Sequence, residues 1–265
     1  MTPPLFRRLV AAYVAIYLLV RAPAFWALRS ASPQRFEGVG LLSWLDGPVG
    51  DALVVGGWTL TVVLAAMLTF DIRPGVVGPA FAAATLTLFT YRSSFGQVLW
   101  FDHLPALHAL VVGLTARAKS DDGWTMRLAA IVTVTTYLLA GIAKLRIGGT
   151  AWVTDGSLAN HIAYSAARLQ VLGENPSPFA APLLSFPKLL NVAGLGTLAI
   201  ELMAPLALLR RVRAGWVLCA WIMHVAIAAS MFVVFPYPLA FVAFAPLFAR
   251  EPDETPPTRR NRATG

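Results

Sequence analysis

One lysine stands near the end of a long apolar run, in the segment YLLAGIAKLRIGGTAWVTDGS at residues 137–157. Lys144 is followed by a glycine pair, Gly148 and Gly149, and then by Trp152. A lysine held away from water gives up its proton more easily, and the neutral amine can act as a general base or a nucleophile. The structural alternative is a lysine that extends its amine from the helix end to the polar interface. If the run crosses a membrane, Lys144 is a candidate functional residue.

Two further ionisable residues interrupt apolar runs later in the chain. Glu201 lies within AIELMAPLALL, and His224 lies within WIMHVAIAASMF. Because an unpaired polar group in hydrocarbon is costly, each of them requires a partner. The candidate partners of Glu201 are Arg21, His224 and Lys144. For both residues, a hydrogen bond between helices with no functional role is the alternative.

Two histidines stand on either side of Pro105 in the segment FDHLPALHAL. On a regular helix, His103 and His108 point about 140° away from each other. This separation argues against a shared metal site, and we predict no metal. We expect one histidine to face the interior as a hydrogen-bonding or proton-handling group, with an interfacial histidine as the alternative. The single cysteine, Cys219, is interpreted as a small buried apolar residue.

The composition indicates that these residues lie in a membrane protein. Apolar residues make up 57% of the chain and charged residues 13%, against about 45–50% and about 25% in soluble proteins. The apolar residues form long runs, several of them near the ~20 residues needed to cross hydrocarbon. We therefore predict an all-α fold, a polytopic integral membrane helical bundle.

The pattern of runs and polar breaks predicts about seven to nine transmembrane helices in one domain, residues 1–249. The expected helices lie at about 9–28, with a kink near Pro23, and at about 51–70, 76–91, 97–116, 124–145, 189–209, 214–232 and 236–249. The segment SLANHIAYSAARLQVL (157–172) is interpreted as an amphipathic helix on the membrane surface or folded over the bundle. The proline-rich, charged residues 250–265 are predicted to be a disordered cytoplasmic tail.

The distribution of basic residues predicts the orientation. With the N-terminus in the cytoplasm, most arginines and lysines fall in cytoplasmic loops, as the positive-inside rule requires. We expect a multi-pass protein of the plasma (inner) membrane with both termini cytoplasmic, and with Lys144 and residues 146–188 toward the other side. The net charge of +8 then reflects topology and contact with the lipid bilayer. It does not indicate a nucleic acid partner, and the sequence does not identify a protein partner.

The segment YLLAGIAKLRIGGTAWVTDGSL resembles the hallmark of the vitamin K-dependent γ-carboxylase-like family, the horizontally transferred transmembrane (HTTM) domain family. That hallmark is an AG-x-x-K-L helix end, followed by a tryptophan and a D/E-G turn. His103 in WFDHLPALHALVVGL is similar to the family's histidine. Glu201 and His224 are similar to an acidic residue and a histidine of later helices.

The resemblance implies chemistry on a reduced quinone of the vitamin K or menaquinol type. The lysine matched by Lys144 is the base that accepts a proton from the reduced quinone, and the histidine matched by His103 supports that reaction. Oxygenation of the quinone then yields a strong base that deprotonates glutamate for carboxylation. If the resemblance holds, Lys144, His103 and at least one of Glu201 and His224 converge on a cavity near the non-cytoplasmic face.

We expect that cavity to be an apolar slot with few polar groups. Trp100, Phe101 and Trp152 are candidate walls, with interfacial anchoring as the alternative, and residues 157–172 are the candidate lid. The cofactor-binding residues are predicted to be Trp100, Glu201 and His224.

Two departures from the family limit the expected reaction. The carboxylases carry a large domain that grips protein substrates, and this chain shows no counterpart, so we expect a small or lipid substrate. The asparagines that precede the family histidine are replaced by Trp100, Phe101 and Asp102. The alternative is a non-catalytic membrane scaffold, or a lipid- or quinone-binding subunit of a larger complex.

Overall fold

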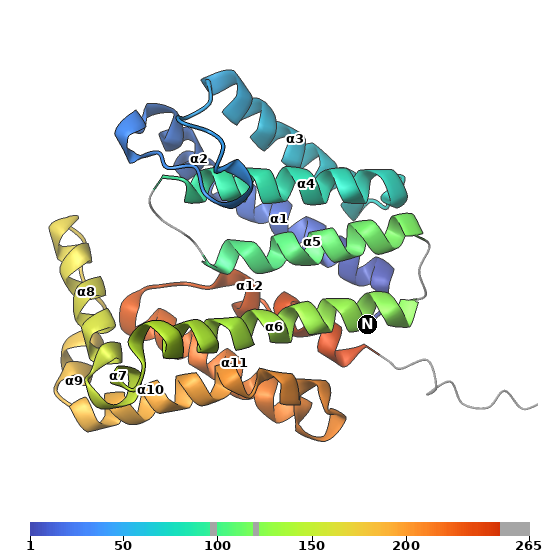
Figure 1. The fold of residues 1–265 in the computed structure, drawn as a ribbon. Helices are drawn as coiled ribbons and strands as arrows, with labels where there is room; N and C mark the ends of the chain where they lie inside the picture. Colours follow the sequence, from blue (N-terminus) through green and yellow to red (C-terminus); the bar gives the residue numbers. More distant parts are fainter. Residues whose placement is uncertain (96–99, 119–121, 250–265) are drawn as a thin grey trace, which may run out of the picture.

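The computed structural model describes residues 1–95, 100–118 and 122–249, and all regular elements in these ranges are helices (Figure 1). Seven α-helices of the described part have 16 residues or more. They are α1 (Pro3–Val20), α3 (Asp51–Thr69), α4 (Pro74–Ser93), α5 (Trp100–Ala118), α6 (Asp122–Gly148), α10 (Pro187–Leu202) and α11 (Arg210–Met231). The all-α prediction is confirmed for the described residues.

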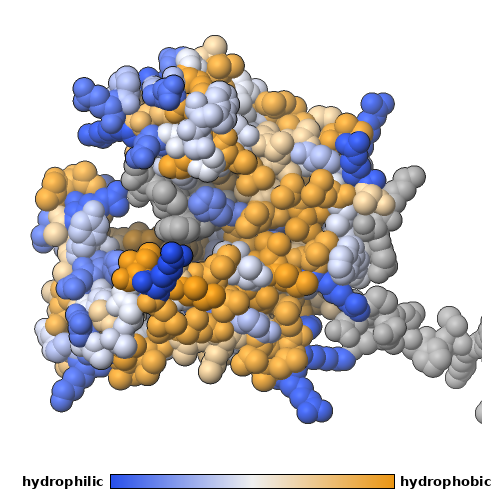
Figure 2. Space-filling view, in the orientation of Figure 1, coloured by the Kyte–Doolittle hydropathy of each residue, from blue (hydrophilic) through white to orange (hydrophobic). Residues whose placement is uncertain are grey.

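Among the described residues, four helices are long and apolar enough to cross a membrane. They are α1, α3, residues Gly123–Gly148 of α6, and α11. Apolar side chains cover much of the face shown in Figure 2, while hydrophilic side chains gather toward its margins. A broad apolar exterior is what a lipid-facing surface requires. The helices are thus compatible with a membrane protein, while the finer count of seven to nine crossings stays a prediction.

The first helix is interrupted close to the expected kink. α1 ends at Val20, and α2 (Ala22–Ala27) begins directly after Arg21 with Pro23 in its first turn. Proline suits a helix start because its missing N–H would have no helical partner there. Arg21 itself is exposed, so it is not buried inside the bundle.

Short 3-10 turns connect α2 to α3 (Leu28–Ser30, Pro33–Arg35 and Gly40–Leu42). Beyond them, α4 and α5 form the most extensive helix pair of the bundle. A Cβ atom on Gly113 would lie 2.6 Å from the backbone of Gly78. The two glycines therefore allow the backbones to cross in direct contact, as small residues do in membrane helix pairs.

The helix expected at 189–209 is divided in two. α10 ends at Leu202, and a 3-10 helix, η4 (Ala204–Leu208), continues the chain. Pro205 has no N–H to offer to the carbonyl of Glu201, which explains why α-helical bonding stops here. The Trp216 Nε1 atom donates a hydrogen bond of 2.9 Å to the neighbouring carbonyl of Ile200. Glu201 consequently lies in the last turn of a broken helix.

The last predicted helix, 236–249, is wrong as a continuous element. The chain instead forms a short helix, α12 (Pro236–Leu239), and a 3-10 helix, η5 (Val242–Phe248). Prolines remove backbone donors here, and Phe241 has a φ of 62° that no α-helix allows. This irregular segment is packed inside the protein, with Tyr237 and Phe244 fully buried. Irregular backbone at membrane depth is tolerated only where protein or water surrounds it.

Three short elements follow α6 at one end of the bundle: α7 (Ala151–Thr154), α8 (Ser157–Val171) and α9 (Ala180–Leu184). α8 stands across the direction of the long helices (Figure 1) and matches the helix predicted at 157–172. It buries Ile162 and leaves Tyr164 and Val171 exposed. Residues 250–265, the predicted tail, lie outside the described residues.

Candidate functional site

The centre of the candidate site is an ion pair between Lys144 of α6 and Glu201 of α10. Gly141, one turn before Lys144, makes the pairing possible. A Cβ atom on Gly141 would lie 3.0 Å from the Cβ atom of Glu201, so the missing side chain lets α10 approach α6. Of the three partners expected for Glu201, the structure selects Lys144.

The two members of the pair differ in burial. The side chain of Lys144 is 23% exposed and that of Glu201 is 6% exposed. The pair is therefore reached from the surface on the lysine side only. Glu201 Oε1 bonds the amine, whereas the buried Oε2 atom has no hydrogen-bond partner among the described residues. An unpartnered buried carboxylate oxygen is costly to maintain and is suited to accept a hydroxyl donor.

Trp152 lies against the amine of Lys144. The Nζ atom is 5.4 Å from the centroid of the indole ring, within reach of a cation–π interaction. Gly148 permits this position, because a Cβ atom there would lie 2.7 Å from the indole. The ring of His161 on α8 stacks on Trp152 with a centroid distance of 5.3 Å. The glycine-rich break thus folds an aromatic cover over the lysine.

The charge of Lys144, which lies beneath this cover, affects the pKa of His161. The partial burial of this histidine and the positive charge of Lys144 lower the pKa of His161 below the ordinary value of 6.5. At neutral pH the ring is therefore uncharged and suited to stacking. Figure 2 shows a hollow beside α8, at the end of the bundle where α6 ends (Figure 1).

A second polar pair lies deeper along the same face of α6. Tyr137 is seven residues, or about 10 Å along the axis, before Lys144, and its hydroxyl is 2.6 Å from His224 Nε2. The other ring nitrogen, His224 Nδ1, is buried without a hydrogen-bond partner among the described residues. Sequence reasoning assigned no role to Tyr137. The spacing of positions 137, 141 and 144, which share one helix face, was the signal that could have found it.

The structure does not show the remaining predicted residues in contact with Lys144. His103 is partly buried in the first turns of α5, at the same end of the bundle as the end of α6 (Figure 1). Among the described residues, no hydrogen bond or ring contact joins it to Lys144. Trp100 begins α5, but its side chain, like that of Phe101, lies outside the described residues. Lys144 and Glu201 are thus in contact, with His224 in an adjoining pair, and the convergence of His103 on the same cavity stays a prediction.

His108 belongs to a separate cluster in the core. Its Nδ1 atom is 2.8 Å from the hydroxyl of Tyr237, and its Nε2 atom is 3.1 Å from both the Ala129 carbonyl and Thr133 Oγ1. The two histidines of α5 therefore occupy different environments. Within the described ranges, no group of three or more potential metal ligands is found.

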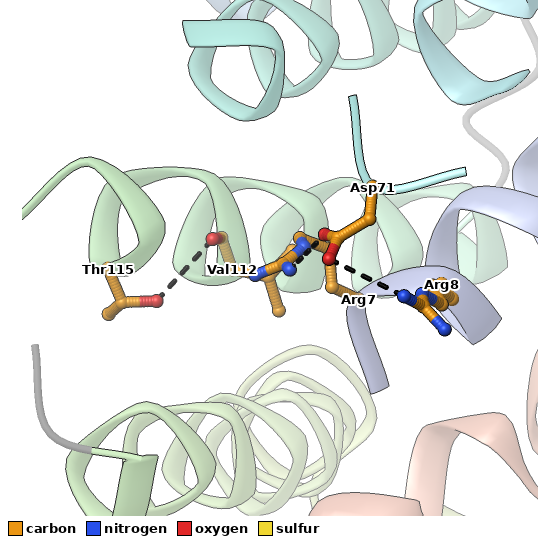
Figure 3. Close-up of polar contacts among 5 residues, drawn as sticks. All are labelled: Arg7, Arg8, Asp71, Val112 and Thr115. Carbon is orange, nitrogen blue, oxygen red and sulfur yellow. Dashed lines mark hydrogen bonds and ion pairs between the residues drawn. The ribbon is translucent and has the colours of Figure 1, made fainter. Parts of the chain in front are cut away.

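A second ion pair ties the opposite end of the bundle together. Arg7 of α1 points toward Asp71 in the turn between α3 and α4, and Arg8 lies 3.4 Å from the other carboxylate oxygen (Figure 3). Burial alone would raise the pKa of Asp71, but the bond to Arg7 and the charges of both arginines hold it below the ordinary value of 3.8. Both carboxylate oxygens are bonded, which is typical of a structural pair.

Comparison with known proteins adds no relative. No protein-family model matches the chain, and no curated protein or solved structure matches it either. The resemblance to the γ-carboxylase-like family therefore stays a prediction, and the geometry around Lys144 and Glu201 is what a functional proposal has to be built on.

Proposed function

We propose that this protein is a membrane enzyme that takes a proton from a reduced quinone at the Lys144–Glu201 pair. The observation that carries the proposal is the buried Oε2 atom of Glu201, which has no partner among the described residues and lies beside a lysine that Trp152 covers. An acceptor, a cation and an aromatic plane at one place are suited to a planar ligand with hydroxyl groups. A structural ion pair requires none of the three to be left available.

The proposed setting is the plasma (inner) membrane, with both termini cytoplasmic. α4, α5 and α10 pack beside the four candidate spans, and together with the broken C-terminal segment they bring the crossings into the proposed range of seven to nine. The start of α1 and the starts of α6 and α11 lie at one end, and the end of α6 lies at the other (Figure 1). This arrangement puts Lys144 on the non-cytoplasmic side when the N-terminus is cytoplasmic.

The chemistry follows from the pair. When bound, a quinol of the vitamin K or menaquinol type supplies two reducing equivalents and acidic hydroxyl protons. Glu201 Oε2 accepts the hydrogen bond of a hydroxyl group, while Lys144 passes its own proton to Glu201 Oε1. The neutral amine of Lys144 then takes the hydroxyl proton, and the ammonium that forms stabilises the negative charge left behind. Such charge stabilisation is strongest where water is excluded.

The surrounding residues have positioning roles in this proposal. Trp152 and His161 exclude water from the amine, and α8 serves as the lid. His224 and Tyr137 orient the inner end of the ligand through the free Nδ1 atom of the imidazole. At the start of α5, His103 supports the proton transfer and Trp100 takes part in binding the quinol. The substrate that the reaction acts on is small or a lipid.

The test is quinol consumption and epoxide formation by the purified protein with a dithionite-reduced menaquinone analogue, dioxygen and bicarbonate. Lys144→Met removes the amine at similar side-chain length. We expect the rate to fall by at least about 100-fold, because a positioned base contributes about that much or more. Lys188→Met, at an exposed position of α10, is the matched control. Equal rates in the wild type and Lys144→Met would remove the catalytic role.

One observation favours a second candidate, a non-catalytic scaffold or quinone-binding subunit. Lys144 already has a carboxylate partner and an aromatic contact, which is sufficient for a purely structural role. A scaffold co-purifies with a constant protein partner and contains no quinone by mass spectrometry, whereas a quinone-binding subunit contains quinone but does not consume quinol. Quinone recovered from the wild type but not from Lys144→Met would exclude a purely structural role for the pair.

A further inference from the structure

A pocket of about 270 Å³ lies at the end of the bundle opposite to Lys144. It is formed where the first turns of α6 and α11 meet η4 and the end of η5. Met126, which lines it, is 18 residues before Lys144 on α6, which corresponds to about 27 Å along the helix axis. The pocket is therefore distinct from the proposed quinol site, and it is independent of the proposed function.

The polar part of the pocket is cationic. Among the described residues that line it, Arg127 and Arg213 are charged and none is acidic. In the described part of the chain, neither guanidinium takes part in an ion pair. Arg213 is held in place by hydrogen bonds from Nε to the carbonyl of Ala207 (3.2 Å) and from Nη2 to that of Leu208 (3.1 Å). Carbonyl partners fix the side chain without neutralising its charge.

The backbone adds to this positive potential. Arg213 belongs to the first turn of α11, so the positive end of that helix dipole points toward the pocket. The first turn of α11 contains no acidic residue and three arginines. Cations at a helix N-terminus are destabilising on their own, and a bound anion offsets that cost. The site therefore favours a ligand with negative charge.

The remainder of the pocket is apolar. Its floor and sides are formed by hydrophobic residues of three elements, α6, η4 and η5: Met126, Ala130, Ile131, Leu208, Pro246 and Leu247. The volume is slightly below the about 300–1,000 Å³ of sites for whole drug-sized ligands, so it suits a headgroup rather than an entire large molecule. Trp124, exposed in the same first turn of α6, is typical of the membrane–water interface.

We propose that this pocket binds the phosphate of an anionic phospholipid, with Arg127 and Arg213 on the phosphate and the apolar floor against the glycerol and the upper acyl chains. Arginine is suited to this task because its planar fork binds phosphate oxygens in pairs. Basic pockets between membrane helices are expected on the side that faces anionic lipid. The same phosphate chemistry occurs in soluble phosphate esters, and the apolar floor favours the lipid.

The test uses the purified full-length protein in a neutral detergent. Binding of phosphatidylglycerol, phosphatidylcholine and glycerol 3-phosphate is measured by native mass spectrometry and by the shift in melting temperature. We expect phosphatidylglycerol to bind and to stabilise, and the other two probes to have little effect. Neutralising one arginine near an anionic lipid surface weakens binding about fivefold, so Arg127→Gln should bind phosphatidylglycerol about fivefold more weakly.

Two further variants keep the result interpretable. Arg168→Gln, at an exposed position of α8, removes the same charge far from the pocket and should bind as the wild type does. Arg127→Glu should bind more weakly than Arg127→Gln because it adds repulsion. Equal binding of phosphatidylglycerol and phosphatidylcholine, or equal losses in Arg127→Gln and Arg168→Gln, would overturn the site. Full competition by glycerol 3-phosphate would overturn the lipid as its ligand.

Discussion

Two buried polar clusters lie in the same bundle, and they differ in whether their hydrogen bonds are complete. Around His108, both ring nitrogens have partners, and Thr133 also donates a hydrogen bond of 2.8 Å to the carbonyl of Ala243. Around Lys144, the Oε2 atom of Glu201 and the Nδ1 atom of His224 have no partner among the described residues. We call the cluster of His108, Tyr237 and Thr133 the closed cluster and that of Lys144, Glu201, Tyr137 and His224 the open cluster.

The difference indicates which cluster holds the fold and which can hold a ligand. A complete network in a low-dielectric interior rigidifies the core, and His108 is fully buried, so no ligand reaches it. The Lys144 side chain is partly exposed, and its cover consists of Trp152 and α8, a helix that stands across the direction of the long helices. Substitutions in the closed cluster should therefore change stability alone, and those in the open cluster should also change activity.

The largest effect is expected when the ion pair is broken on one side. Lys144→Met leaves the buried carboxylate of Glu201 without a cation, which typically costs about 3–5 kcal/mol, and it abolishes the base. The double variant Lys144→Met with Glu201→Gln should recover most of that stability but none of the quinol oxidation. Denaturant unfolding and quinol consumption on the same preparations measure the two effects. Recovery of activity in the double variant would contradict the role of Lys144.

Tyr237→Phe tests the closed cluster. It removes the hydroxyl that bonds His108 Nδ1 and leaves a buried nitrogen unpaired, so the free energy of unfolding should fall by about 1–3 kcal/mol. Quinol oxidation per folded molecule should be unchanged. A selective loss of activity at full folding would show that the His108 cluster takes part in the reaction.

Tyr137→Phe is the matched substitution in the open cluster, because it removes the other tyrosine–histidine bond. We expect a smaller loss of stability, about 1 kcal/mol, since His224 is already incompletely bonded. The KM for quinol should rise several-fold as the imidazole loses its orientation. Steady-state kinetics check this, and a KM equal to that of the wild type would remove the positioning role of His224.

The smallest effect concerns pH. The pKa of His161 is lowered in the folded protein, so the unfolded chain binds more protons as the pH falls. The contribution of His161 to the free energy of unfolding is fully present above about pH 6.5. It is lost as the pH decreases toward the pKa that His161 has in the folded protein. His161→Gln should therefore flatten the dependence of the melting temperature on pH between about pH 7 and pH 5. Identical slopes in both proteins would show that folding does not lower the pKa of His161.

Much of the fold follows from the sequence, because long apolar runs separated by glycine and proline breaks are typical of membrane helices, in which the backbone hydrogen bonds are made within each segment. The boundaries of α3 and α8 were predicted to within one residue at either end. The C-terminal segment was not, because its prolines and the positive φ of Phe241 depend on tertiary packing that pattern cannot supply.

The site was predictable in part. The unusual residue types at Lys144, Glu201 and His224 identify a polar interior, but the pairing depends on how close α10 comes to α6. That distance is determined by Gly141 and by the break at Pro205, both of which act through packing. The closed network of His108 needs a partner, Tyr237, from a segment 129 residues away, which no local pattern indicates.

The most direct measurement is the location of a bound quinone. A menaquinone analogue with a photoreactive diazirine is irradiated with the purified protein, and the labelled residues are mapped by mass spectrometry. We predict labels on residues 144–161, competed by excess menaquinone and strongly reduced in Lys144→Met. Labels near His108 and Tyr237, or labels in residues 144–161 that neither competition nor Lys144→Met reduces, would contradict the assignment of the open cluster as the quinone site.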